Sequence, residues 1–367
     1  MTKFHFLGVG SMGSLVAHEL AKANPIAQKE ITLLFKNNPT VDSFKHHDSR
    51  ITVNTVTNSD ISTASSQLLG AHHIQPSEPL ENLVISTKAY QTEDALRRYI
   101  PNIQPSTNLI LLQNGMGMWE HLLSVYWPYE ANRPNIYQCI STHGAYKSAP
   151  FTCNHVGLGK LDIAKVEPHQ AKYKKRKSNT TAASLSDPPE IIRLLLGTPA
   201  LNTSYMDFPN LLLKQIEKLV VNACINPLTA IFDCQNGDLL YTATLPKLMT
   251  KVIREAILVF KLEYPQLQSL PEAEVILNED RLLNSVLQVC KLTAKNSSSM
   301  REDVRLLKPT EIYWINGFIS RLGQKHRIPT NTNNLLQEML STKLSISRVQ
   351  EDQSLNLVLD TVNQYIK

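Results

Sequence analysis

The feature that most constrains this chain is a glycine-rich motif close to its start. A short apolar segment of strand length begins at Phe4, and a helical pattern begins at Ser14. The motif between them consists of Gly8, Val9, Gly10, Ser11, Met12 and Gly13. Glycines at this spacing allow a tight turn, a close approach of the backbone to a pyrophosphate, and close packing of the helix on the strand. The start of the helix adds unpaired N–H groups. The sequence therefore predicts a dinucleotide site here.

The residue after the second predicted strand indicates which dinucleotide binds. That strand covers residues 30–35 and is followed by Lys36. NAD sites usually carry an acidic residue at this point to bind the ribose 2′-hydroxyl, whereas a basic residue accommodates a 2′-phosphate. Lys36 therefore favours NADP over NAD, the alternative being an ordinary solvated loop lysine.

Strand-length apolar segments recur along the first half of the chain. After a polar, insertion-like stretch over residues 39–80, they cover residues 82–87, 108–113, 136–140, 159–164 and 202–206. Their alternation with helical patterns predicts a doubly wound α/β domain. Ligands collect at the carboxyl ends of parallel strands, so Lys88 and Asn114 are candidate cofactor contacts. His143 beside a glycine could act in acid–base chemistry, but a structural role is commoner for such a histidine.

Helical patterns replace strands in the second half of the chain. They cover residues 210–231, 245–262, 281–294, 308–326, 333–342 and 354–365. A chain of 367 residues exceeds what one hydrophobic core usually organises. We therefore expect an α/β N-terminal Rossmann-type dinucleotide-binding domain over 1–206, with a polar and basic insertion at about 168–189. An all-α C-terminal domain over 207–367 is expected to bind substrate and to mediate dimerisation, with the substrate in the cleft between the domains.

One predicted helix, over residues 211–226, carries an unusual polar stripe. Lys218, Asn222 and Asn226 are spaced four apart and share a face, while the rest of the segment is largely apolar. One ammonium and two amides on a stripe predict a helix that lines a polar cleft and binds a small, oxygen-rich molecule. The alternative is an amphipathic surface helix. Pro227 predicts that the helix ends or kinks at Asn226.

Composition and charge limit the remaining function classes. The net charge of +5 is a mild excess, and a basic run at residues 172–177 lies within the polar insertion. Such a run is usually a solvated loop, and no RNA-recognition or zinc-finger signature accompanies it, so no nucleic acid is expected. No apolar run approaches the ~20 residues of a membrane span, and no N-terminal targeting segment is seen, which predicts a cytoplasmic protein without a membrane contact. Five scattered cysteines without a C-x-x-C pair predict reduced thiols and no metal site.

Seven motifs, in order along nearly the whole chain, resemble those of the ketopantoate reductase (2-dehydropantoate 2-reductase) family. The sequence as a whole is similar to the fungal members of this family. They are the glycine motif, Ser86-Thr-Lys88-Ala-Tyr-Gln, Gln113-Asn114-Gly-Met-Gly, Thr142-His-Gly-Ala145, Lys218-Leu-Val-Val-Asn222-Ala-Cys-Ile-Asn226-Pro-Leu-Thr-Ala-Ile, Asn296-Ser-Ser-Ser299-Met and Thr310-Glu311-Ile-Tyr-Trp-Ile-Asn-Gly. The segments around Asn226 and Ser299 are the most specific of these.

The resemblance implies an enzyme that uses NADPH to reduce ketopantoate to (R)-pantoate on the route to pantothenate and coenzyme A. It also implies the roles of the substrate-binding residues. Lys218 is the expected general acid, in agreement with the chemistry of a partly buried lysine. Asn222 and Asn226 are expected to bind the oxygens of the substrate, Ser299 its carboxylate and Glu311 its terminal hydroxyl.

The cofactor contacts implied by the resemblance involve both halves of the chain. Lys36 and Lys88 are expected to bind the adenosine-side phosphate of NADPH, and Asn114 to reach both the nicotinamide and the substrate. Ala145 and Glu311 are further expected cofactor contacts. Two alternatives remain, a related NADP-dependent reductase of another 2-keto or 3-hydroxy acid and a non-catalytic relative that binds RNA or protein.

Overall fold

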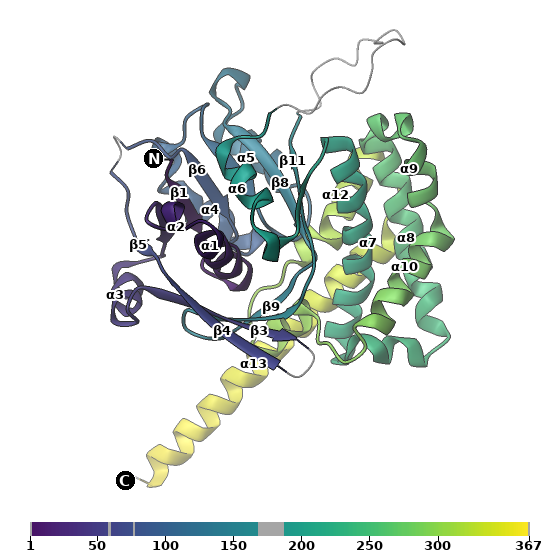
Figure 1. Ribbon diagram of the computed structural model, residues 1–367. Coiled ribbons are helices and arrows are strands. Elements are labelled where there is room, and N and C mark those ends of the chain that lie inside the picture. The colour runs from purple at the N-terminus through teal and green to yellow at the C-terminus, as the bar shows by residue number, and fades with distance from the viewer. Residues whose placement is uncertain (1, 58–59, 76–77, 168–186, 366–367) are drawn as a thin grey trace. The chain divides into compact units, whose positions relative to one another are not determined.

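The computed structural model describes residues 2–57, 60–75, 78–167 and 187–365, with side chains up to residue 353 (Figure 1). The chain forms two compact units. The first comprises Met1–Asn114 and Met118–Leu212, and the second comprises Gly115–Gly117 and Leu213–Lys367. The first unit is α/β and the second is helical, so the expected fold class is confirmed. The basic run at residues 172–177 lies outside the described residues.

The first unit is organised around an eight-stranded sheet of order β12-β11-β8-β7-β6-β1-β2-β5. Its strands are β1 (Phe4–Leu7), β2 (Ile31–Leu34), β5 (Leu69–Ala71), β6 (Asn82–Ile85), β7 (Asn108–Leu111), β8 (Asn135–Ser141), β11 (Leu161–Lys165) and β12 (Thr203–Tyr205). From β5 to β8 all neighbours are parallel, and the order of the strands reverses at β1. Strands β1 and β6 are buried along their whole length, as expected for parallel strands covered on both faces.

A second, four-stranded sheet was not expected from the sequence. It has the order β4-β3-β10-β9 and is formed by β3 (Arg50–Thr57), β4 (Asp60–Gln67), β9 (Gly144–Ala149) and β10 (Thr152–Gly157). Residues 39–80, interpreted above as a polar insertion, thus contribute two of its strands. The interpretation was wrong because β4 is rich in serine and threonine and mostly exposed, so it lacks an apolar strand pattern.

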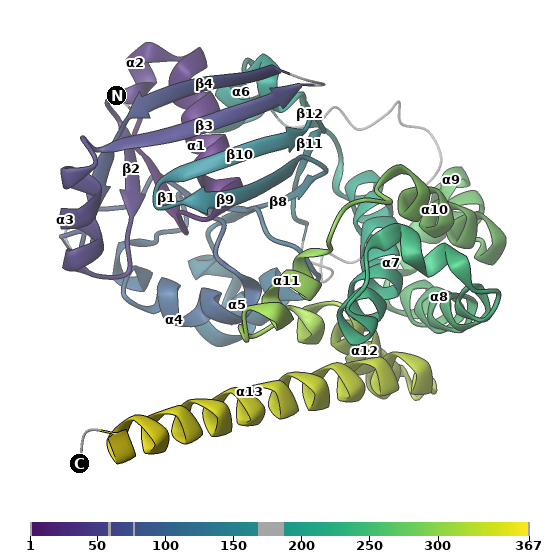
Figure 2. The ribbon, with the colours of Figure 1, turned by 90° about the horizontal axis from the view of Figure 1, so that it is seen from below.

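Helix α1 (Ser11–Ala23) lies between the two sheets (Figure 2). It packs against β1 on one side and against β3, β9 and β10 on the other. This double cover explains why residues 13–21 are all buried, including His18 and Glu19. Helices α4 (Thr92–Arg97) and α5 (Met118–Tyr126) lie on the opposite face of the larger sheet (Figure 2). The remaining helices of the unit are α2 (Pro25–Gln28), α3 (Asn38–His46) and α6 (Glu190–Leu196).

In the residues that the structure describes, the second unit is built from helices and their connections. Its α-helices are α7 (Phe208–Phe232), which starts in the first unit, α8 (Thr244–Glu263), α9 (Pro271–Ile276), α10 (Glu279–Leu292), α11 (Ser299–Arg305), α12 (Asn316–His326) and α13 (Asn331–Tyr365). Short helices α9 and α11 were not predicted. The patterns at 333–342 and 354–365 belong to one continuous helix, α13. Helix α13 packs against α8 and α12.

Helix α7 runs through Pro227 to Phe232, close to the helical pattern expected over residues 210–231, so of the two possibilities given for Asn226 an end of the helix is excluded. Proline lacks an N–H and leaves the carbonyl four residues earlier without its helical partner. Here that carbonyl belongs to Ala223, and it accepts a hydrogen bond of 3.0 Å from Nδ2 of Asn316. The freed acceptor is therefore satisfied by a neighbouring helix, which removes much of the cost of a buried proline.

Asn316 also connects α7 to two further helices. Its Nδ2 donates to Oδ1 of Asn333 at 3.0 Å, and Nδ2 of Asn333 donates to Oε2 of Glu255 at 2.7 Å. The two carboxylate oxygens of Glu255 accept from the backbone N–H groups of Thr332 and Asn333. Glu255 thereby satisfies two of the donors that the start of α13 leaves without helical partners.

Two further properties of the described residues bear on the expectations above. None of their helices is both long and apolar enough to cross a membrane. All five cysteines carry free thiols, and four of them, Cys139, Cys153, Cys224 and Cys290, are buried.

Two buried histidines make the stability of the first unit depend on pH. Burial lowers the pKa of His5 and of His18 from 6.5 to about 4. As the pH falls below 6.5, the unfolded chain binds protons that the folded chain does not, so stability falls between about pH 6.5 and pH 4. Each histidine should lower the free energy of unfolding by about 2 kcal/mol between pH 7 and pH 5.

Chemical denaturation at pH 7 and pH 5 measures this effect. The variant His18→Gln should reduce the difference between the two pH values by about 2 kcal/mol, whereas His46→Gln, at an exposed histidine, should keep all of it. An unchanged pH dependence in His18→Gln would contradict the assignment.

Candidate active site

The glycine motif forms the turn between β1 and α1, and two of its glycines are sterically required. Gly8 has φ +102°, and a Cβ there would lie 2.5 Å from the backbone nitrogen of Thr87. A Cβ at Gly13 would lie 2.2 Å from the carbonyl oxygen of Gly8 and from Oγ of Ser86. Ser86 also donates a hydrogen bond of 2.5 Å to that same carbonyl. The turn therefore packs directly on the residues that follow β6.

The N-terminus of α1 is free to face an anion. Gly10 is the N-cap residue, it provides no side-chain cap, and the first turn carries no acidic residue. A Cβ at Gly10 would meet no heavy atom of the described residues within 4 Å. The space beside Gly10 at the start of α1 is therefore open, and the N-terminus of a helix suits a phosphate group.

A cavity of about 550 Å³ opens beside this turn. Leu7, Gly8 and Val9 line it from the glycine motif, and Phe35, Lys36 and Thr40 line it from the end of β2 and the start of α3. The other residues of its wall include Thr87, Tyr90, Gln91, Asp94, Arg98, Lys147 and Phe151. The dimensions and the position at the carboxyl ends of β1 and β2 fit the adenosine half of a dinucleotide.

Three cations line this cavity, and only one of them was predicted. Lys36 follows β2, Arg98 follows α4 and Lys147 lies in β9. The NH1 group of Arg98 donates a hydrogen bond of 3.1 Å to the carbonyl oxygen of Lys36. No local motif marks Arg98 or Lys147, because their proximity to Lys36 results from the folding of distant segments.

The other predicted cofactor residues of the first unit lie on separate elements. Lys88 is the N-cap residue of the 3₁₀ helix η1 (Ala89–Gln91) and is not among the residues that line the cavity, although its neighbour Thr87 is. Ala145 lies in β9 and packs against the core that surrounds α1. Asn114 is exposed and is the last residue of the first unit before Gly115.

His143 has a structural environment. It is buried, its Nε2 lies 2.9 Å from the carbonyl oxygen of Leu201, and its Nδ1 accepts from the backbone N–H of Gly159 at 3.1 Å. Its Nδ1 also lies 3.1 Å from Nε2 of His155. Both ring nitrogens of His143 therefore have partners within the protein. This favours a structural role for His143 over a role in acid–base chemistry.

Helix α7 presents Lys218, Asn222 and Asn226 in the second unit. Lys218 and Asn222 are half-buried, and Asn226 is buried. Burial lowers the pKa of Lys218 to about 8, and the negative charge of Glu311 opposes this shift. Glu311 is 5% exposed and precedes the 3₁₀ helix η7 (Ile312–Trp314). The charges of Lys218 and Glu311, which are distant in the sequence, therefore interact in the folded chain.

Ser299 is the first residue of α11 and is exposed. The residue before it, Ser298, is buried and its Oγ lies 2.7 Å from Oγ1 of Thr229 on α7. Thr229 also donates to the carbonyl oxygen of Asn226 at 3.0 Å. The start of α11, and with it Ser299, therefore lies beside the end of the polar stripe of α7.

The segment Gly115–Gly117 contacts η7 and α12. Gly115 has φ +87°, and a Cβ there would lie 2.6 Å from the carbonyl oxygen of Trp314. The backbone N–H of Met116 donates to that carbonyl at 3.0 Å. The glycines of the Asn114 motif thus serve close packing beside the segment that carries Glu311.

The chain is similar to known proteins along nearly its whole length. Two family models match the chain, "Ketopantoate reductase PanE/ApbA" over residues 4–168 and "Ketopantoate reductase PanE/ApbA C terminal" over residues 210–344. A probable 2-dehydropantoate 2-reductase of Schizosaccharomyces pombe is 37% identical over 346 residues, which cover 94% of this chain and 97% of that protein.

Two further similarities are more distant. The cytochrome B translational activator CBS2 of Saccharomyces cerevisiae is 24% identical, over 94% of this chain and 96% of that protein. Among solved structures, the ternary complex of D-mandelate dehydrogenase with NADH and anilino(oxo)acetate superimposes with a TM-score of 0.73. It is 22% identical, and the match covers 94% of this chain and 98% of that chain, so it shows a shared fold.

The open space at Gly10 gives a direct test of the dinucleotide site. Gly10→Ala should fold normally, because the added methyl group meets no described atom. It should weaken nucleotide binding at least tenfold, because the methyl group occupies the space in which a phosphate approaches the backbone. Titration of nucleotide by fluorescence, together with thermal unfolding, measures both properties.

The control is Gly197→Ala, at the end of α6, where a Cβ has only ordinary contacts of 3.5 Å and more. Wild-type affinity in Gly10→Ala would mean that the phosphate lies elsewhere.

Proposed function

The chain belongs to the ketopantoate reductase family, and on that premise we propose that it reduces ketopantoate to (R)-pantoate with NADPH, a step toward pantothenate and coenzyme A. The observation that carries this proposal is the polar stripe of α7 with its partner Glu311. The stripe combines a lysine whose pKa is lowered to about 8 with two amides and a nearby carboxylate. This set matches a substrate that has a ketone, a carboxylate and a hydroxyl group.

Binding of a nicotinamide dinucleotide is supported by the first unit. When bound, the cofactor would supply the hydride for the ketone carbon. The N–H groups at the start of α1 would hold the pyrophosphate, and the cavity beside Gly8 would hold the adenosine. The preference for NADPH is supported by Lys36, Arg98 and Lys147 in the cavity wall and by the absence of a carboxylate directly after β2.

Lys218 is proposed as the general acid. Reduction of the ketone places negative charge on its oxygen, and a positioned acid can deliver a proton there. With a pKa of about 8, Lys218 is largely protonated at neutral pH, and its lowered pKa makes proton release easier than from an exposed lysine. Glu311 keeps the ammonium form populated, since its charge raises the pKa that burial lowers.

The other polar residues of the second unit are proposed to bind the substrate. Asn222 and Asn226 would donate hydrogen bonds to its oxygens without adding charge, and Ser299 would bind its carboxylate. Glu311 would accept a hydrogen bond from the terminal hydroxyl. A substrate without that hydroxyl would lack this hydrogen bond to a buried carboxylate, and such contacts can discriminate by about ten-thousandfold. We further propose that Lys88, Asn114 and Ala145 contact the cofactor, as does Glu311.

Both alternative functions make different predictions about the same residues. A related reductase of another keto acid would not need Glu311 to bind a hydroxyl group. The similarity to a translational activator keeps a non-catalytic role testable, but such a protein would have no need for Lys218, Asn222, Asn226 and Glu311 together. RNA binding that survives moderate salt in a filter assay would support that role.

Turnover tests the reaction and the acid together. Purified protein should oxidise NADPH rapidly with ketopantoate and much more slowly with ketoisovalerate, which lacks the hydroxyl. Lys218→Met should lower kcat by about 10²- to 10⁴-fold, because it removes the proton donor. In the wild type, the rate of reduction should fall as the pH rises through about 8, since the ammonium form is then lost.

Lys214→Met is a suitable control, because Lys214 lies on the same helix but is exposed. Its activity should be close to that of the wild type. Tight NADPH binding without turnover of any keto acid would contradict the proposed reaction while leaving the dinucleotide site intact.

The three cations of the cavity test the choice of cofactor. Arg98→Met and Lys147→Met should each raise the Kd of NADPH about tenfold, because each removes a charge-assisted contact with the 2′-phosphate. The Kd of NADH should change less than twofold in both variants. Lys29→Met, at an exposed lysine outside the cavity, should change neither value. An equal loss of affinity for NADPH and NADH would show that these cations do not bind the 2′-phosphate.

A further inference from the structure

The polar face of α7 continues beyond the residues proposed to bind substrate. Thr229 follows Asn226 by three positions and shares its side of the helix, and Asp233 follows the last helical residue, Phe232. Both residues contact α11, the short helix that begins with Ser299. One face of α7 thus carries the proposed chemistry in its middle and two contacts with α11 at its end.

The first contact joins Thr229 to the cap of α11. Thr229 is fully buried, and its Oγ1 lies 2.7 Å from Oγ of Ser298. Oγ of Ser298 accepts a hydrogen bond of 3.1 Å from the backbone N–H of Arg301, which is the N-cap interaction of the helix. The cap that starts α11 is therefore also the point at which α11 contacts α7.

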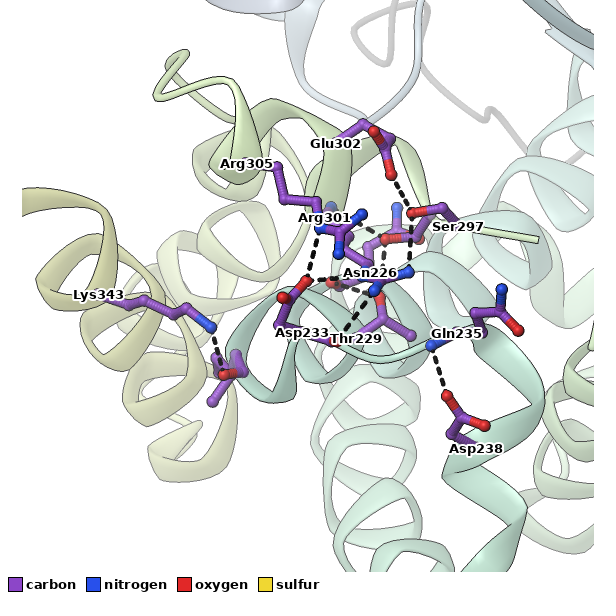
Figure 3. A network of polar contacts seen from close by, with 12 residues as sticks. Asn226, Thr229, Asp233, Gln235, Asp238, Ser297, Arg301, Glu302, Arg305 and Lys343 are labelled. Atoms are coloured by element: carbon purple, nitrogen blue, oxygen red, sulfur yellow. Dashed lines mark hydrogen bonds and ion pairs between the residues drawn. The ribbon is translucent and has the colours of Figure 1, made fainter. Parts of the chain in front are cut away.

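The second contact is an ion pair between Asp233 and Arg301 (Figure 3). Nε of Arg301 donates to Oδ1 of Asp233 at 2.8 Å, and its NH2 group donates to the carbonyl oxygen of Asp233 at 3.0 Å. The side chain of Arg301 is only 10% exposed. The hydrogen bond from Arg301 is the main reason why the pKa of Asp233 lies below its ordinary value.

A second arginine binds the same carboxylate from a more exposed position. Nε of Arg305 lies 2.9 Å from Oδ1 of Asp233, and the Arg305 side chain is 50% exposed. Figure 3 shows Arg301 and Arg305 pointing toward Asp233 from consecutive turns of α11. Arg301 alone also binds the backbone of Asp233, so its geometry fixes the end of α7 more firmly than that of Arg305.

We infer that Asp233 and Arg301 are positioning residues that hold the first turn of α11 against the end of α7 and thereby set the affinity for the carboxylate of the keto acid. Ser299 is exposed and lies in the same helical turn as Arg301, so the place of its hydroxyl group depends on how this turn docks. The inference rests on the proposed function, in which Ser299 binds that carboxylate.

The expected signature is a change in substrate affinity with little change in chemistry or cofactor binding. Arg301→Met should raise KM for ketopantoate about tenfold, keep kcat within about threefold, and leave the Kd of NADPH unchanged, because Lys218 and the first unit are untouched. Arg301→Lys should keep the raised KM, since an ammonium group cannot reproduce both contacts with Asp233. Calorimetric titration of pantoate in the presence of NADP⁺ should show the same loss of affinity.

The matched control is Arg305→Met, which removes the exposed arginine from the same carboxylate and should change KM less than twofold. Thermal unfolding of each variant shows whether it folds. If Arg301→Met does not fold, Asp233→Asn replaces it, because it keeps the size of the side chain and weakens the ion pair.

Each outcome has a distinct meaning. A raised KM confined to Arg301 and Asp233 variants supports the inference. An unchanged KM in a folded Arg301→Met, or an equal rise in Arg305→Met, overturns it while leaving the proposed function standing. A wild-type protein that does not turn over ketopantoate would instead reject the proposed function itself.

Discussion

The hydrogen bond from Asn316 to the carbonyl of Ala223 is the interaction on which the candidate site of the second unit depends. Pro227 removes one backbone donor from the middle of α7, and the amide of Asn316 replaces it from α12. Because this acceptor is satisfied, α7 can continue to Phe232. The same helix then carries Lys218 and Asn222 before the proline and Thr229 after it, all on one face. Asn333 and Glu255 extend the network to α8 and α13, so four helices are held by one set of polar contacts.

In the first unit, the glycine turn leaves the start of α1 without a side chain at Gly10, as the proposed phosphate site requires. Gly8 and Gly13 let α1 approach the residues after β6, and the four-stranded sheet covers the other side of α1. The N-terminus of α1 is thereby fixed between two sheets, while the space at Gly10 stays open. The positive charges of the cavity do not come from the glycine turn. They belong to Lys36, Arg98 and Lys147, which lie on three separate segments of the cavity wall.

The fold class could be predicted because its signals are local. A buried strand, a glycine turn and a helix lie next to one another in residues 4–23, and long helical periodicities mark the second half. The four-stranded sheet could not be predicted, because its polar strand β4 is stabilised by pairing with β3 along its whole length rather than by an apolar pattern. Whether Pro227 ends α7 or lets it continue could not be decided from the sequence for a related reason, since the partner of the freed carbonyl lies far away in the sequence.

The sequence by itself determined the arrangement of residues that lie on one element. It determined the glycine turn at the start of α1, and it determined that Lys218, Asn222 and Asn226 share one face of α7. Family membership also followed from motifs that the sequence carries in order. Only the tertiary structure decided which distant groups meet. It brought the charge of Glu311 close enough to Lys218 to raise the pKa of that lysine. It also placed Arg98 and Lys147 in the wall of the cavity that Lys36 lines, and it paired Arg301 with Asp233. The reason is physical: backbone geometry fixes neighbours within a helix or turn, whereas contacts between elements depend on how the whole chain packs.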